Sequence, residues 1–182
     1  MTAVTNATFS QFGAGYDEIE AGERRVRVTP TGDAANPVID ENLTLTKDEH
    51  YTLFAVNNDQ NVFSLLRFQD NLSEPSAGKG HIRIAHLIPD ASNVKLSFQG
   101  TGQGAIIPDA AFLEKTENFT SVDAGEVTLR IQEVDGKQPI LPDLPFTLEE
   151  RYIYTVALTG TLDEGDSIDA QIVMVKHEES HD

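Results

Sequence analysis

Residues 20–28 read Glu-Ala-Gly-Glu-Arg-Arg-Val-Arg-Val, and residues 123–131 read Asp-Ala-Gly-Glu-Val-Thr-Leu-Arg-Ile. Each stretch opens with a turn at Ala-Gly and then alternates polar with apolar side chains, which is the period of two of a half-buried β-strand. The turn glycines, Gly22 and Gly125, stand where the backbone is expected to take a positive φ. The same strand signature therefore occurs twice, 103 residues apart.

The repeat extends well beyond this strand. The same offset aligns Leu43-Thr-Leu with Phe146-Thr-Leu, and Tyr51-Thr-Leu with Tyr154-Thr-Val. It holds without a gap from about residue 6 to residue 56. The aligned blocks are strands or turns, and no segment shows a sustained helical period with caps. We therefore predict an all-β chain built from two tandem modules.

The second copy has more sequence in front of it than the first. Residues 81–88 and 94–98 alternate apolar and polar side chains, and nothing upstream of Ala7 matches them. The first module is therefore predicted to lack about two N-terminal strands. The Pro-, Gly- and Ser-rich stretch between the copies predicts a boundary, which gives a partial module over 1–72, a linker over 73–80 and a complete module over 81–182.

Period-two patterning also predicts which side chains are buried. Arg27 and Arg130 are expected to be exposed. The apolar face of these strands is expected to be buried, at Val26, Val28, Ile82, Ile84, His86, Leu129 and Ile131. An incomplete first module would leave an open strand edge, and such edges are normally paired or covered. A homodimer formed through that edge is the predicted outcome.

Charge restricts the partners. The chain carries 30 acidic and 13 basic residues, a formal net charge of −17. A surface of this sign repels phosphate backbones and anionic lipids, so nucleic acid and membrane surfaces are not expected partners. There is no cysteine, no run long enough to insert in a membrane, and no signal-peptide pattern at the start.

The second copy opens with a recognisable motif. Its Arg83, His86, Pro89-Asp-Ala, Val94-Lys-Leu-Ser-Phe and Gly100 resemble the opening of a bacterial extracellular domain family, DUF4397. The resemblance covers 81–176 as one module and about 5–70 as the remainder of another. It implies an immunoglobulin-like or related β-sandwich in secreted or surface-anchored lipoproteins. It supplies no activity and no catalytic residues.

Two residues near this motif are predicted to have a structural role. His86 follows Ile82 and Ile84 on the apolar face of its strand, where a histidine usually donates to a nearby carbonyl or carboxylate. Asp90 lies four residues further along the chain, across the Pro89 turn. We predict that it is the partner that fixes the tautomer of His86.

An acidic stretch near the C-terminus offers a candidate metal site. Asp163, Asp166 and Asp169 lie in a segment with four carboxylates among seven residues. Ca²⁺ prefers six to eight oxygen ligands supplied by a loop of this kind, but the EF-hand spacing is absent. A solvated acidic turn and a Ca²⁺ site both fit the pattern, and no other cofactor is expected.

Three functions fit the sequence to different degrees. The first is a non-catalytic extracellular or cell-surface module that acts as a spacer, or that binds a glycan or a protein partner. The second is a Ca²⁺-dependent structural module. The third is a hydrolase with paired carboxylates, for which pairs such as Glu149/Glu150 are unsuited because adjacent residues on a strand point to opposite faces. We therefore expect no enzymatic activity.

Overall fold

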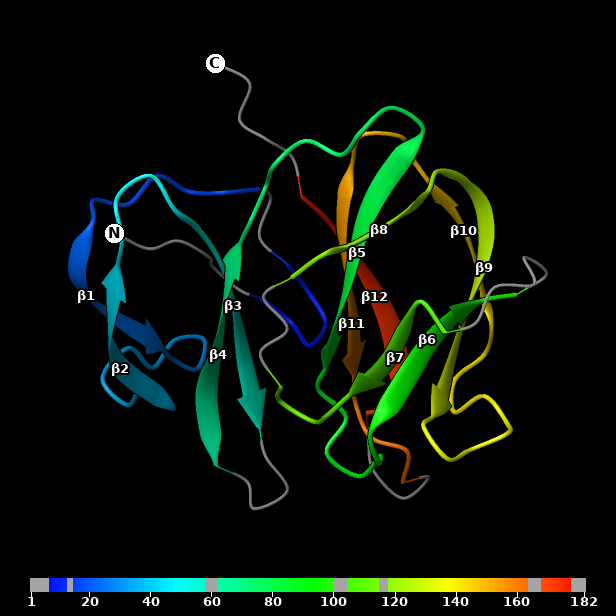
Figure 1. Ribbon diagram of the computed structural model, residues 1–182. Helices are drawn as coiled ribbons and strands as arrows, with labels where there is room; N and C mark the ends of the chain where they lie inside the picture. The colour runs from blue at the N-terminus through cyan, green and yellow to red at the C-terminus, as the bar shows by residue number, and fades with distance from the viewer. Residues whose placement is uncertain are drawn as a thin grey trace. The chain divides into compact units, whose positions relative to one another are not determined.

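A computed structural model describes residues 7–12, 15–57, 62–99, 105–114, 118–163 and 168–177. In these ranges the chain forms twelve strands in four sheets and no helix, which confirms the all-β prediction (Figure 1). None of the described residues forms a helix that could cross a membrane. The immunoglobulin-like detail stays a prediction.

The chain divides into two compact units, with the boundary between Asp70 and Asn71. Unit 1 contains β1 (Gly22–Val28), β2 (Ile39–Leu45), β3 (His50–Asn57) and β4 (Phe63–Asp70). Unit 2 contains the other eight strands: β5 (Lys79–His86), β6 (Val94–Phe98), β7 (Ile107–Ala110), β8 (Thr120–Asp123), β9 (Gly125–Glu133), β10 (Leu144–Leu148), β11 (Ile153–Thr159) and β12 (Gln171–His177).

Unit 2 is a sandwich of two four-stranded sheets, whose strands are coloured green to red in Figure 1. One sheet has the order β10-β9-β6-β7 and the other β12-β11-β5-β8. The pairing of β5 with β11 is parallel, and the other pairings are antiparallel. The core contains side chains from both sheets, among them Ile82, Leu96, Leu129 and Val156, which are fully buried.

Unit 1 consists of two antiparallel hairpins, β1-β2 and β3-β4. The hairpins are held together by side chains that reach from one to the other. Arg67 on β4 donates to the carbonyl of Thr44 on β2 at 2.8 Å. The guanidinium of Arg67 also lies over the ring of Tyr51, 5.2 Å from the ring centroid.

The sequence repeat is reproduced in the backbone. Gly22 pairs with Leu45 in β1-β2, and the corresponding Gly125 pairs with Leu148 in β9-β10. Both glycines have positive φ, 107° and 140°, as the turn pattern predicts. Two pairs of other residues at the same offset also share left-handed backbone angles: Ser10 with Leu113, and Asp48 with Arg151. The hydroxyls of Tyr51 and Tyr154 accept equivalent backbone bonds, from Thr46 and Glu149.

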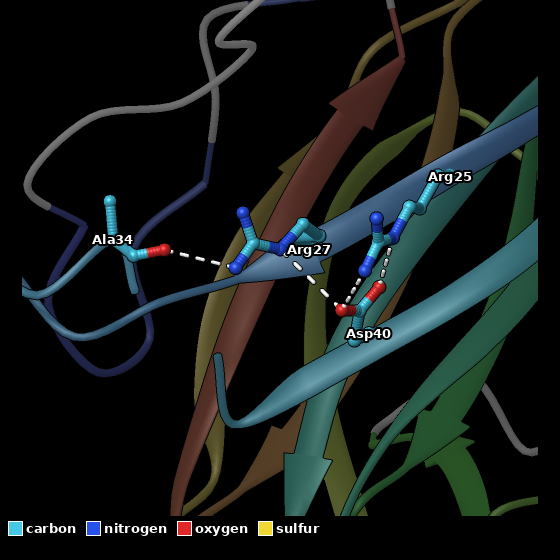
Figure 2. A network of polar contacts seen from close by, with 4 residues as sticks. All are labelled: Arg25, Arg27, Ala34 and Asp40. Atoms are coloured by element: carbon cyan, nitrogen blue, oxygen red, sulfur yellow. Dashed lines mark hydrogen bonds and ion pairs between the residues drawn. The ribbon is translucent and has the colours of Figure 1, made fainter. Parts of the chain in front are cut away.

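A repeated ion pair accompanies this register (Figure 2). The Asp40 carboxylate on β2 accepts two hydrogen bonds from Arg25, and Arg27 lies 3.6 Å from it while donating to the Ala34 carbonyl. In unit 2 the counterparts of Arg27 and Asp40 are Arg130 and Asp143, and there Arg130 itself donates two hydrogen bonds to the carboxylate, as Arg25 does in unit 1. Arg25 holds the pKa of Asp40 below its usual value, with burial acting in the opposite direction.

The burial predictions hold for the core face of unit 2 and fail in part for the valines of unit 1 and for Arg130. Ile82, Ile84, His86, Leu129 and Ile131 are at most 1% exposed, as predicted. Arg27 is exposed as predicted, but Val26 and Val28 are half-buried because unit 1 has fewer strands to cover them. Arg130 is also half-buried, since it folds against Asp143.

The predicted linker over 73–80 is wrong at its C-terminal end. Lys79 and Gly80 are the first residues of β5. A Cβ on Gly80 would clash with the Leu148 side chain, so this glycine allows close strand packing. Upstream, Glu74 forms an ion pair with Arg151, and this segment is therefore anchored to unit 2.

The unequal burial gives a matched mutational test. Ile131→Ala removes a side chain that is 1% exposed and should lower the free energy of unfolding by about 2–5 kcal/mol. Val28→Ala at the equivalent position of unit 1, where the side chain is half-buried, should cost only about 1 kcal/mol. Denaturant unfolding of both variants measures the difference, and equal losses would show that the two modules are packed alike.

Candidate functional site

One carboxylate binds together two loops of unit 2. Asp90 lies in the turn between β5 and β6 and accepts hydrogen bonds from the beginning of the β11-β12 loop. Its donors are the Thr161 hydroxyl at 2.7 Å, the Leu162 N–H at 2.8 Å and the Asp163 N–H at 2.9 Å. The Pro-Asp-Ala motif therefore fixes the position of a neighbouring loop at this end of the sandwich.

The same contacts set the charge state of Asp90. Burial alone would raise the pKa of this carboxyl, but hydrogen bonds from Leu162, Thr161 and Asp163 together outweigh burial and lower the pKa below its usual value. A carboxylate with a lowered folded-state pKa stabilises the protein at all pH values above its unfolded-state pKa. That contribution is lost as the pH falls through the folded-state pKa.

Asp90→Asn should therefore destabilise unit 2 in a pH-dependent way. At neutral pH the loss of charge-assisted hydrogen bonds should cost about 1–2 kcal/mol. The difference from the wild type should begin to shrink as the pH falls below about 4, the ordinary pKa of an aspartate, and should disappear only once the pH is below the lowered folded-state pKa of Asp90. Unfolding measured from pH 3 to pH 7 gives the profile. Asp48→Asn, at a side chain that is 82% exposed, is the control, and an equal profile for both variants would contradict the assignment.

The predicted pairing of His86 with Asp90 is wrong. His86 is buried as expected, but its Nδ1 accepts from the Ile88 N–H at 3.4 Å, so Nε2 carries the proton and donates to the Ser92 carbonyl at 3.1 Å. Burial lowers the pKa of His86 and outweighs the bond to Ser92. Asp90 is turned toward the β11-β12 loop, where three donors converge on it, and this is why the imidazole pairs with a carbonyl instead.

Sequence reasoning missed a buried arginine. Arg83 is 1% exposed and lies on the face of its sheet opposite to the core residues Ile82 and Ile84. Its Nε donates to the Thr155 hydroxyl at 2.8 Å, and its guanidinium lies 4.4 Å from the centroid of the Phe119 ring. An alternating pattern predicts an exposed arginine here. The signal that could have found it is the presence of arginine in the DUF4397-like opening motif.

A histidine completes this cluster. The Thr155 hydroxyl lies 2.7 Å from Nε2 of His177, and the His177 ring packs edge-on against Phe119. Thr155 is 0% exposed and His177 is 5% exposed. The residues come from β5, β11, β12 and the segment before β8, so the cluster ties one face of the sheet together.

Unit 1 has an equivalent cluster with different chemistry. Thr52 and Tyr16 are the counterparts of Thr155 and Phe119 at the repeat offset. The Thr52 and Tyr16 hydroxyls donate to the same oxygen of Asp70, at 2.6 and 2.7 Å. Asp70 pairs with the first residue of β3 as His177 pairs with the first residue of β11, so a carboxylate replaces the imidazole. This carboxylate is 3% exposed.

Glu149 and Glu150, the carboxylate pair of the hydrolase alternative, have separate structural partners. Glu149 accepts a hydrogen bond from Lys176 at 2.8 Å, whereas Glu150 accepts one from the Gly78 N–H at 2.9 Å. An open depression over the β9-β10 hairpin contains one carboxylate, Glu126, beside Gln99. These contacts position strands and turns.

The calcium prediction falls partly outside the described residues, which do not include Asp166. The backbone N–H of Asp163 donates to the Asp90 carboxylate, and the backbone of Asp169 forms an isolated parallel β-bridge with that of Thr161. The described part of the chain contains no group of three acidic or histidine residues arranged to hold a metal ion. The Ca²⁺ site at Asp163, Asp166 and Asp169 stays a prediction.

A thermal melt tests that prediction. If the acidic loop binds Ca²⁺ in the folded state, the melting temperature should rise as the Ca²⁺ concentration passes the dissociation constant. The comparison is between chelator and millimolar Ca²⁺, for the wild type and for Asp169→Asn. A wild-type melting temperature that does not move would assign the loop as a solvated turn.

Comparison with protein families agrees with the opening motif. The sequence model described as "Domain of unknown function (DUF4397)" matches residues 1–97, which is more than half of the chain. The chain belongs to the DUF4397 family. No curated protein matches the chain.

The DUF4397 match does not coincide with one structural unit. It includes all of unit 1, continues through β5 and ends at Ser97 in β6. The matched region therefore contains four strands of unit 1 and also β5 and β6, which have no counterpart strands among the described residues of unit 1. The remaining strands of unit 2 are related to the match through the internal repeat.

Proposed function

We propose that this DUF4397 chain is a non-catalytic extracellular or cell-surface module. Its tandem copies space or present a binding surface for a glycan or a protein partner. The proposed location follows from the resemblance to surface lipoproteins. The chain's formal charge of −17 is consistent with partners that are neither nucleic acids nor anionic membranes.

The observation that carries this proposal is the duplication of the module in both register and turn geometry. The hairpin β1-β2 is repeated as β9-β10 with the same residue pairings, and left-handed residues occur at the same offset. Repeating a module multiplies weak contacts or sets the distance between them. Selection for reach or for multivalent binding explains such duplication.

The buried polar groups support a scaffold. Arg83, His86 and His177 each have partners within the fold. Among the described residues, no buried side-chain nitrogen or oxygen lacks a hydrogen-bond partner. Asp90 joins the β5-β6 turn to residues 161–163 at one end of unit 2, and we assign the binding surface to these two segments.

A glycan array and a pull-down from intact cell surfaces test this function. The full chain, displayed at high density, should bind a glycan or a surface protein saturably, and the ligand should be recovered chemically unchanged. Asp90→Asn should weaken binding because it releases the loop, whereas Asp48→Asn should not. Turnover of a bound ligand would contradict the proposal. If neither the glycan array nor the pull-down shows binding, the binding role is eliminated and the spacer role remains.

A further inference from the structure

In unit 2, β9 and β11 are each hydrogen-bonded to another strand along both edges. Over the described residues, their counterparts in unit 1 are hydrogen-bonded along one edge only. β9 pairs with β10 on one side and β6 on the other, and β11 pairs with β12 and β5. In unit 1 the equivalent strands, β1 and β3, belong to two-stranded sheets over the described residues. The second edge of each is therefore the place where a strand of the β5 or β6 type pairs in the other copy.

Apolar side chains next to these edges are exposed in unit 1 and buried in unit 2. Leu53 is 37% exposed, whereas its counterpart Val156 is 0% exposed. Ile19 is 48% exposed, and its counterpart Val122 on β8 is 7% exposed. Residues 17–20 correspond to β8 but form no strand, because β8 depends on pairing with β5. Unit 1 thus has the apolar surface that a docked β5-like strand would cover.

Unit 1 has an acidic group, Asp70, near the position where an equivalent of Arg83 would lie. In β5, Arg83 lies directly opposite Thr155 in the parallel pairing and donates to its hydroxyl. The corresponding hydroxyl of unit 1, Thr52, already contacts the carboxylate of Asp70. An arginine placed opposite Thr52, in a strand docked beside β3, would contact the Asp70 carboxylate. In unit 2 the corresponding position is occupied by His177. The site is therefore complementary in charge to a β5-like strand.

We propose that unit 1 accepts an extended strand pair of the β5-β6 type, distinct from the pair that its own unit 2 uses. The first strand lies parallel to β3 and carries alternating apolar residues with an arginine between two of them, as in Ile82-Arg-Ile. Its arginine contacts Thr52 and Asp70. The second strand lies antiparallel to β1. This inference does not depend on which partner the loops of unit 2 bind.

A second copy of this chain fits the site less well than a different donor. The described residues contain one β5-β6 pair, which unit 2 already uses, so exchange of that pair between two copies leaves one place empty. Direct pairing of β1 with β1 of another copy, centred on Arg25, would bring like charges opposite each other, which is unfavourable. The occupant is therefore a strand pair that is not already part of a unit 2.

A peptide with the sequence of residues 79–98 is the probe, and the full chain is the receptor. It should bind saturably, with one peptide per chain, and slow amide hydrogen exchange across β3. A control peptide with glutamate at the position of Arg83 should bind at least about tenfold more weakly, because a charge-assisted contact is lost. Asp70→Asn in the receptor should reduce the discrimination between the two peptides.

Other results would overturn the inference. These are equal binding of the two peptides, protection confined to unit 2, or no binding of either. If the chain is a dimer and the amides of β3 already exchange slowly before peptide is added, the free edge of β3 is paired with a second copy. Since Asp70→Asn could unfold unit 1, Leu53→Glu is the second variant, because this side chain is partly exposed. It should fold and lose peptide binding, and full binding would also contradict the proposal.

Discussion

The pairing of β5 with β11 and of β6 with β9 is the constraint on which the complete module depends. These pairings close two sheets and place Ile82, Ile84, Val94 and Leu96 in the core, where each is at most 1% exposed. Full burial of one such aliphatic side chain contributes about 1.5–3 kcal/mol. The two strands thus satisfy backbone edges and supply much of the core of unit 2.

Comparison of the two copies distinguishes structure that is specified locally from structure that needs strands distant in the sequence. The hairpins β1-β2 and β9-β10 have the same register and the same turn glycines, because a hairpin is specified by its own turn and strands. Sheet closure is different, since it needs strands from elsewhere in the chain. Over its described residues, unit 1 has the hairpins without the closure, and this difference explains its half-buried valines and exposed Leu53.

The features that the sequence predicts are those specified locally, and the features that it misses depend on residues distant in the sequence. The repeat offset, the positive φ of Gly22 and Gly125, and the buried face of β5 were all accessible from local patterns. The burial of Arg83 was not, because its partners Thr155 and Phe119 are distant in sequence and lie on the face that period two assigns to solvent. The candidate site was predicted less well than the fold. Asp90 was identified, but its donors lie more than 70 residues away.

Native-state hydrogen exchange of β3 against β11 tests the central claim most directly. The strands are equivalent in the repeat, but β11 is bonded on both edges and fully buried, whereas β3 belongs to a two-stranded sheet. Amides of β11 should exchange only through global unfolding of unit 2, and those of β3 should exchange through smaller openings, at least about a hundredfold faster. Equal protection of the two strands would show that unit 1 is closed without a β5-β6 pair and would contradict the account.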